Sequence, residues 1–140
     1  FCFFFSRRHT SRIWNEVSLM GVVSTYTANT MLNSLFYGKP TYIGLHISDP
    51  TVLGDYGTEV ASGDYIRQQV QFSDAGSRGT GNTTQALFVG MPDVTVTHMA
   101  IWDNVTTGNM LSFKALDVPI DVADGQTFVV PVSTVAVSFT

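Results

Sequence analysis

Cysteine is almost absent from this chain, in which Cys2 is the only one. A single cysteine cannot form a disulfide within the chain, and no cysteine pair has the spacing of a metal site. No apolar run approaches the roughly 20 residues that a helix needs to cross a bilayer. The sequence therefore predicts neither a disulfide-stabilised scaffold nor a membrane partner.

Charged side chains are also scarce. They make up 13% of the 140 residues, about half the usual share in soluble domains, whereas aromatic residues make up 12%. We expect neighbouring protein to cover part of such a surface, which predicts a homo-oligomer. The chain has 7 basic and 11 acidic residues, of which three arginines and one glutamate precede Met20, so residues 20–140 keep 4 basic and 10 acidic residues, a net −6. This sign argues against a nucleic-acid partner, which is bound by neutralising phosphates.

Patterns typical of catalysis are missing as well. There is no G-x-S-x-G nucleophile elbow. The glycines of Ser73–Thr84 lack the spacing and the lysine of a phosphate-binding loop, which predicts a hairpin or a surface loop. His46 and His98 have no spacing that would fix a metal site with Asp49 or Asp103. We therefore expect no enzyme, no cofactor and no metal.

The acidic loop Thr51–Asp64 leaves one alternative open. Its Asp55, Glu59 and Asp64 could bind calcium through carboxylate oxygens. The loop lacks the alternating ligands and the terminal glutamate of an EF-hand, and solvated surface is the default interpretation of acidic loop residues.

What the sequence does contain is a repeated strand signal. Alternating apolar residues predict strands at Thr41–Ser48 and at Tyr65–Phe72, on either side of the acidic loop. Asp49-Pro50 ends the first strand, because proline has no amide proton for a ladder. The expected core face of this strand carries Ile43, Leu45 and Ile47.

The same alternation continues downstream. Further strands are predicted at Gln85–Val89, Val94–Trp102, Met110–Leu116, Thr127–Val132 and Thr134–Phe139. In Val94–Trp102 the pattern places Val94, Val96, Ala100 and Trp102 on one face, and Met99 and Ile101 on the other. Because both faces are apolar, this strand is expected in the middle of a sheet or at a subunit contact.

Only one helix is predicted, over Ser24–Phe36, with Ser24 or Thr25 as its N-cap. Its apolar residues recur with helical spacing, at Ala28, Met31, Leu32, Leu35 and Phe36. The expected fold is mainly β: an antiparallel β-sandwich of about six to eight strands with one short N-terminal α-helix. We expect a single domain over residues 24–140.

Residues 1–23 form an expected N-terminal arm. The order of its apolar and basic parts is wrong for a signal peptide, and Met20 is an alternative start of the protein. The aromatic residues of the arm either pack on another chain or fold back onto their own domain. Candidate interface residues are Phe3, Phe4, Phe5, Trp14 and Trp102.

Two motifs carry a resemblance to a known family. The first is L-H-x-S-D-P, beginning at Leu45, followed by G-T-E-V-x-S-G-x-Y-x-R-x-x-V-x-F, beginning at Gly57. The second is V-T-H-M-A-I-W-D, beginning at Val96, followed by G-N-M-L and G-Q-T. From about Ser24 onward the chain resembles small bacteriophage virion proteins described as tail-fibre-like or minor capsid proteins.

The resemblance implies a non-enzymatic virion structural protein assembled in the bacterial host cytoplasm. Because one domain uses the whole chain and leaves no fibrous shaft, the main expectation is a capsid-decorating (cement) protein. The alternatives are a tail-fibre or tail-tip component, or a carbohydrate-binding receptor module with Tyr56, Tyr65 and Trp102 as stacking aromatics. The expected partners are copies of itself, as a trimer, and the major capsid protein or tail proteins of the same virion.

Overall fold

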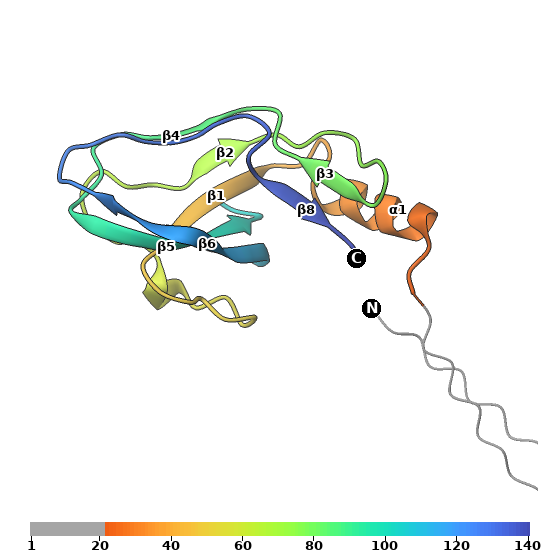
Figure 1. Cartoon of the computed structure of the whole chain (residues 1–140), viewed down its shortest axis with the longest axis horizontal. Helices are drawn as coiled ribbons and strands as arrows, with labels where there is room; N and C mark the ends of the chain where they lie inside the picture. The colour runs from red at the N-terminus through yellow and green to blue at the C-terminus, as the bar shows by residue number, and fades with distance from the viewer. Residues whose placement is uncertain (1–21) are drawn as a thin grey trace, which may run out of the picture.

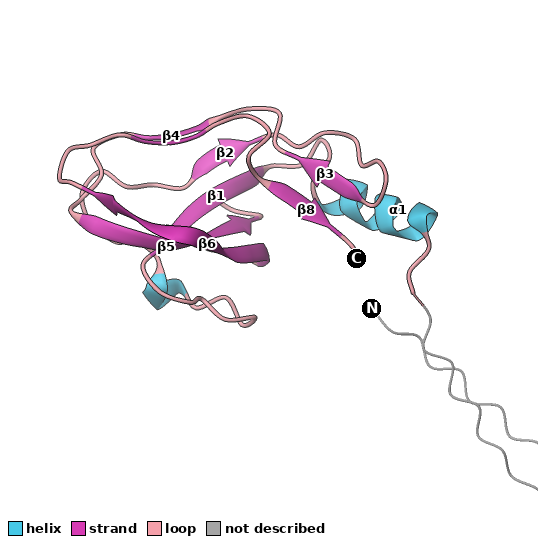
Figure 2. Cartoon of the chain, viewed as in Figure 1, coloured by secondary structure: helices cyan, strands magenta, loops and turns pink. Residues whose placement is uncertain are grey.

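The computed structural model describes residues 22–140, and residues 1–21 lie outside that range. Within it the chain is mainly β, with eight strands and one helix near its start (Figures 1 and 2). The elements are α1 (Thr25–Leu35), β1 (Thr41–His46), the 3-10 turn η1 (Tyr56–Thr58), β2 (Gln68–Val70), β3 (Gly79–Gly81), β4 (Ala86–Phe88), β5 (Val94–Trp102), β6 (Met110–Val122), β7 (Phe128–Val130) and β8 (Ala136–Ser138). The strands pair antiparallel, which confirms the predicted fold class. No helix in this part of the chain is long and apolar enough to cross a membrane.

One layer of the sandwich is a four-stranded sheet with the order β2-β1-β5-β6. β5 pairs with β1 on one side and with β6 on the other, which confirms the central position predicted for this strand. β6 runs beyond the predicted end at Leu116 to Val122, and its last residues pair with Val94–Val96. Pro119 is tolerated within β6 because β6 is an edge strand. One side of an edge strand has no neighbouring strand, so a residue without a backbone N–H leaves no hydrogen bond unmade there.

The second layer consists of two short strand pairs, β4–β7 and β3–β8. In Figure 1 they follow one another along a two-stranded ribbon that covers one face of the sheet. The prediction of a hairpin or surface loop over Ser73–Thr84 fits the turn between Gly76 and Gly79, which exchange backbone hydrogen bonds. The additional pairing of Gly79–Gly81 with β8 is not predicted, because glycine has a low strand propensity. We call the segments 79–92 and 125–140, which contain this ribbon, the ribbon layer.

The buried side chain of Asn82 bridges the interruption between the two strand pairs. Its Nδ2 donates to the carbonyls of Thr84 and Pro131, both at 2.9 Å, and its Oδ1 accepts from the N–H of Val135 at 2.9 Å. Its backbone N–H and carbonyl bond to Val135 and Ser133. Asn82 thereby links the two segments of the ribbon at the point where the regular pairing between the strand pairs β3–β8 and β4–β7 is interrupted.

The chain after β2 closes one side of the sandwich by passing from the sheet to the ribbon. Thr83 donates its N–H to the Gln71 carbonyl at 2.8 Å, and Ser73 donates its N–H to the Gly81 carbonyl at 2.9 Å. Strands that switch layers in this way make the corners of sandwiches. On the opposite side, β6 and β8 are the edges of their layers, and the described chain places no strand between them.

A register shift between β5 and β6 marks the place where the side-chain alternation of β5 changes. Between Val96 and His98 the pairing advances two residues along β5 but five along β6, from Ile120 to Ala115, and irregular pairing of this kind disrupts the ladder locally. Val96 and Ile101 therefore both pack in the core between the layers, whereas Trp102 lies on the outer face beside Gly44. The prediction that Val96 and Trp102 share a face is wrong for this reason.

The helix begins where the sequence predicts. Ser24 is its N-cap, and the hydroxyl oxygen of Ser24 accepts the N–H of Thr27 at 3.2 Å. The buried members of its apolar stripe are Ala28, Leu32 and Phe36. Leu35 is exposed instead of core-facing, as is Ile47, because β1 ends at His46 and Ile47 already belongs to the following loop.

Both ends of the described chain meet beside β3, at Arg78. The Arg78 guanidinium donates to the carbonyl of Val23 and, at 3.3 Å, to that of Phe139. The backbone N–H of Arg78 donates to Oδ1 of Asn29 at 3.0 Å. These bonds hold α1 and the end of β8 to the turn that leads into β3 (Figure 1). The predicted boundary between arm and domain at residue 23 stays a prediction.

Candidate functional site

The outer face of the four-stranded sheet carries a cluster of polar and aromatic side chains around Trp102. We call it the Trp102 cluster; its members are His46, Tyr56, Glu59, Tyr65, Arg67 and Trp102. Trp102 lies over Gly44 of the neighbouring strand. A Cβ atom on Gly44 would come within 2.9 Å of Nε1 of Trp102 and 3.0 Å of Oε1 of Glu59. Position 44 therefore requires glycine because of close approach, not because of its backbone angles.

Arg67 joins three segments of the chain within this cluster. Its Nε and Nη2 donate to the two carboxylate oxygens of Glu59, both at 2.8 Å, which makes a bidentate ion pair. Its Nη1 donates to the carbonyls of Asn104 and Thr107, both at 2.9 Å. Its guanidinium carbon lies 3.9 Å from the centre of the Trp102 ring, a cation–π contact. The almost fully buried arginine thereby fixes the loop after β1 and the turn after β5.

Tyr65 supports the same carboxylate from the side of the core. Its hydroxyl donates to Oε1 of Glu59 and accepts the N–H of Leu45, both at 2.8 Å. Its ring stacks on Phe88 of the ribbon, with 5.7 Å between the ring centres. Burial, followed by the nearby Glu59 charge, raises the pKa of Tyr65 well above its usual value. The phenol therefore stays protonated and remains a donor to Glu59.

His46 is completely buried beneath the loop. Thr58 donates its hydroxyl proton to the Asp55 carbonyl at 2.9 Å, and the same Oγ1 lies 2.8 Å from Nδ1 of His46. Nδ1 of His46 therefore acts as the donor and carries the proton, while Nε2 has no partner among residues 22–140. Burial lowers the pKa of His46, and the Glu59 charge only opposes this effect. The imidazole is accordingly neutral near neutral pH.

The Trp102 cluster anchors a loop over residues 47–58 that projects from the sheet (Figure 1). The Tyr56 ring stacks on Trp102 at 5.1 Å, and the Tyr56 hydroxyl donates to the Gly108 carbonyl. The backbone N–H of Asp55 donates to the Pro50 carbonyl at 2.8 Å, which closes the loop. At its tip Val52 and Leu53 are 85% and 90% exposed. The cluster thus holds an apolar tip away from the body of the domain.

The structure places the predicted site residues unevenly. Phe3, Phe4, Phe5 and Trp14 lie outside the described residues, so their interface role stays a prediction. Trp102 is 1% exposed in the single chain, so its own subunit already covers its ring. An interface role for Trp102 also stays a prediction, and any such contact would be made through the loop that covers it.

The other candidate residues are engaged within the chain. Of the three aromatic residues suggested for sugar stacking, Trp102 and Tyr65 are covered by their own subunit, and only Tyr56 is exposed. Of the calcium candidates, Asp55 accepts the N–H of Gly57 at 2.8 Å and Glu59 is bound by Arg67. In the part of the chain that the structure describes, no three histidine, cysteine, aspartate or glutamate side chains gather as a metal site would require.

The ion pair between Arg67 and Glu59 was not predicted from the sequence. Both belong to the recognised motif, but their approach depends on the path of the loop between them. One signal was available: Arg67 is a rare cation within an otherwise strand-like stretch, and a buried arginine requires a paired acid.

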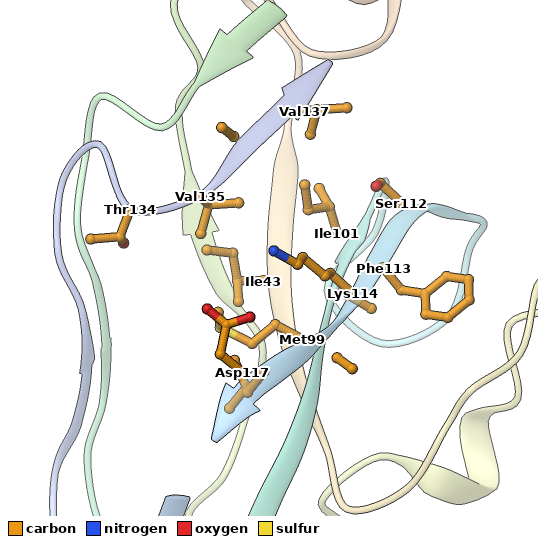
Figure 3. Close-up of a pocket in the computed structure, with 14 residues that line it drawn as sticks. Ile43, Met99, Ile101, Ser112, Phe113, Lys114, Asp117, Thr134, Val135 and Val137 are labelled. Atoms are coloured by element: carbon orange, nitrogen blue, oxygen red, sulfur yellow. The ribbon is translucent and has the colours of Figure 1, made fainter. Parts of the chain in front are cut away.

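The open side of the sandwich contains a groove of about 290 Å³ between β6 and β8. Figure 3 shows its floor, which includes Ile43, Met99 and Ile101, with Val137 of β8 and the preceding Val135 along one wall. The β6 wall runs from Ser112 to Asp117 and includes Lys114. Interior apolar side chains are therefore reachable here from outside the domain.

Comparison with known proteins identifies the family. The chain matches the protein-family model described as "Podophage GP4 fiber I protein gp80" over residues 22–138. No curated protein matches the chain. The matched range covers nearly all of the described residues and includes the recognised motifs, so the predicted resemblance to phage tail-fibre-like virion proteins is confirmed. The chain belongs to the Podophage GP4 fiber I protein gp80 family of phage fibre structural proteins.

Proposed function

We propose that this protein is a subunit of a phage tail fibre and acts by binding other virion proteins. The observation that carries the proposal is the extent of the family match. It spans residues 22–138, which include every helix and strand described. The folded domain is thus itself the fibre module. Capsid decoration, the main expectation from the sequence, has no comparable support, and the family description favours the tail-fibre alternative.

The mode of action follows from the sandwich and its two accessible features. A β-sandwich held by a bidentate ion pair and a bridging asparagine presents its surfaces with fixed geometry. The projecting loop and the β6–β8 groove offer apolar contacts to neighbouring proteins. The partners in this proposal are copies of the chain, expected as a trimer, and other tail proteins of the same virion.

A non-catalytic role is part of the proposal. The Glu59 carboxylate is held by Arg67 and Tyr65. Asp103 accepts the backbone N–H of Asn109 at 2.7 Å and its side-chain amide at 2.9 Å, and these bonds lower the pKa of Asp103. Both carboxylates are thus occupied by hydrogen bonds that stabilise the neighbouring loops and turns. We therefore expect no hydrolysis of host polysaccharide or peptidoglycan.

The experiment that tests the proposal is to locate the chain in the virion. An electron microscopy map of intact particles should place the sandwich in tail-fibre density. Particles lacking residues 22–138 should lose that density, while their heads remain unchanged. Density on the capsid surface instead would overturn the fibre assignment in favour of capsid decoration.

A further inference from the structure

The ribbon layer carries no charged side chain. Residues 79–92 hold β3 and β4, residues 125–140 hold β7 and β8, and neither segment contains Asp, Glu, Lys, Arg or His. The acidic residues of the described chain lie instead on the four-stranded sheet, in its loops and in the turns that lead into the ribbon. The charged side chains of the described chain thus belong to segments outside the ribbon layer.

The ribbon layer also presents apolar side chains outward. Leu87 and Val129 face each other across β4 and β7 and are both exposed, as is Val89. Their strand neighbours Phe88 and Val130 point into the core and are buried. A sheet face in contact with water normally carries polar residues at such outward positions. Apolar residues without charge are instead the composition of the centre of a protein interface.

The charge on the rest of the molecule indicates which partner fits this face. Residues 22–140 contain 4 basic and 10 acidic residues, a net −6, and all of these charges lie outside the ribbon layer. Two copies that met through their other faces would repel each other, and burying an unpaired carboxylate there would be costly. The ribbon layer adds no carboxylate of its own to such a contact, and the acid packed against it is Asp64, beside Gly90.

We propose that copies of this chain associate through the ribbon layer, with the layers turned towards one another around a closed symmetry axis. The inference rests on the proposed fibre function, because it names the face by which one fibre subunit binds the next. The projecting loop of residues 47–58 lies on the outer face of the other layer and points away from this contact.

Two lysine substitutions in the full-length chain test the proposal. Val129→Lys puts a charge at the centre of the ribbon layer, at a position 46% exposed in the single chain. Val118→Lys is the matched control, because Val118 is 71% exposed on the edge strand β6 of the other layer. Light scattering should find an oligomer for the unmodified protein and for Val118→Lys. For Val129→Lys we expect the dissociation constant to rise about tenfold or more, with thermal unfolding still cooperative.

A mixing experiment shows whether like layers meet. Val129→Glu should weaken association as Val129→Lys does, and a mixture of the two variants should regain it through opposite charges. Two results would overturn the proposal: a monomeric unmodified protein, or an oligomer that Val118→Lys disrupts and Val129→Lys does not. If the protein is monomeric and Val129→Lys instead abolishes attachment to the virion, the layer binds a different virion protein. Self-association is measured on purified protein and the fibre assignment on particles, so the two proposals fail separately.

Discussion

At the scale of single residues, Arg67 and Glu59 show how a buried charge becomes a constraint on shape. A charged group taken out of water is stable only when it is paired and hydrogen-bonded. Arg67 meets this condition only if the loop carrying Glu59 and the turn of Asn104 and Thr107 are both in place. The bonds of Arg67 therefore fix the conformation of two loops, the one that carries Glu59 and the turn of Asn104 and Thr107, whose local sequences do not determine it.

We expect Arg67→Leu to lower the free energy of unfolding by about 3–5 kcal/mol, because it leaves the Glu59 carboxylate with no cation. Denaturant unfolding measures the change. The double variant Arg67→Leu, Glu59→Leu should recover part of the loss, since it removes both charges. Lys39→Leu, at an exposed position, is the control and should change stability by less than about 0.5 kcal/mol. Similar losses for Arg67→Leu and Lys39→Leu would contradict the role assigned to the ion pair.

Gly44 makes a second prediction possible. Gly44→Ala should destabilise the domain by about 1–3 kcal/mol, because its methyl group would press on Trp102 and Glu59. Gly76→Ala is a matched control, since no atom lies within 4 Å of where its Cβ would stand. Thermal unfolding of the two variants makes the comparison, and an equal effect at both positions would show that close packing over Gly44 does not matter.

His46 predicts a dependence of stability on acid. Its pKa is lowered in the folded protein, whereas the unfolded value is 6.5, so below that pH the unfolded chain binds more protons than the folded one. Stability is therefore complete above about pH 6.5 and is lost as the pH falls towards the folded pKa. The slope is at most about 1.4 kcal/mol per pH unit for one proton.

Replacing His46 with glutamine removes this proton, so urea unfolding of His46→Gln between pH 7 and pH 5 should show a weaker pH dependence than the unmodified protein. Gln85→Ala, an exposed change that leaves every histidine in place, should retain the original dependence. The interpretation is wrong if the His46→Gln profile keeps the slope of the unmodified protein.

At the scale of elements, the sequence predicts best what depends on local pattern. The helix cap at Ser24, both ends of β5 and the hairpin between β5 and β6 follow from periodicity and turn residues. β3 could not be predicted, because its glycines become a strand only through pairing with the distant β8. The register shift between β5 and β6 could not be predicted either, since it depends on how residues 115–120 of β6 pair with β5.

The Trp102 cluster shows the same limit. All of its members except Tyr56 belong to the recognised motifs, and the sequence offers Trp102 as a candidate interface and sugar-stacking residue. What covers it comes from Tyr56 and Arg67, whose approach is set by a long loop. Spacing along the chain does not encode that contact.

Asn82 carries the main prediction at this scale. We expect Asn82→Ala to cost about 1–3 kcal/mol for each buried group that it leaves unpaired, and to open the ribbon between β3 and β4. Hydrogen exchange should therefore speed up at Ser133 and Val135 before the rest of the sheet is affected. Gln85→Ala, an exposed change in the same segment, should leave exchange unaltered. Uniform acceleration over both layers would instead indicate a general loss of stability.

At the scale of the whole molecule, the two faces of the sandwich differ in chemistry. One carries the acidic loops and the projecting apolar tip, and the other is the uncharged ribbon layer. If copies associate through the ribbon layer, every tip points outward from the assembly. One domain then provides both cohesion between subunits and an outer contact surface.

The meeting of both ends of the described chain at Arg78 has a mechanical consequence. Val23 and Phe139 are bound by the same side chain, so a pull between the two ends acts across β8 and β3 and does not stretch the sandwich along its length. Force applied in this direction would peel β8 from β3 one residue pair at a time. We expect single-molecule pulling between these ends to give an early, low-force release of β8, followed by rupture of the four-stranded sheet at higher force. Arg78→Gln, which weakens the junction, should lower the first rupture force and leave the second unchanged.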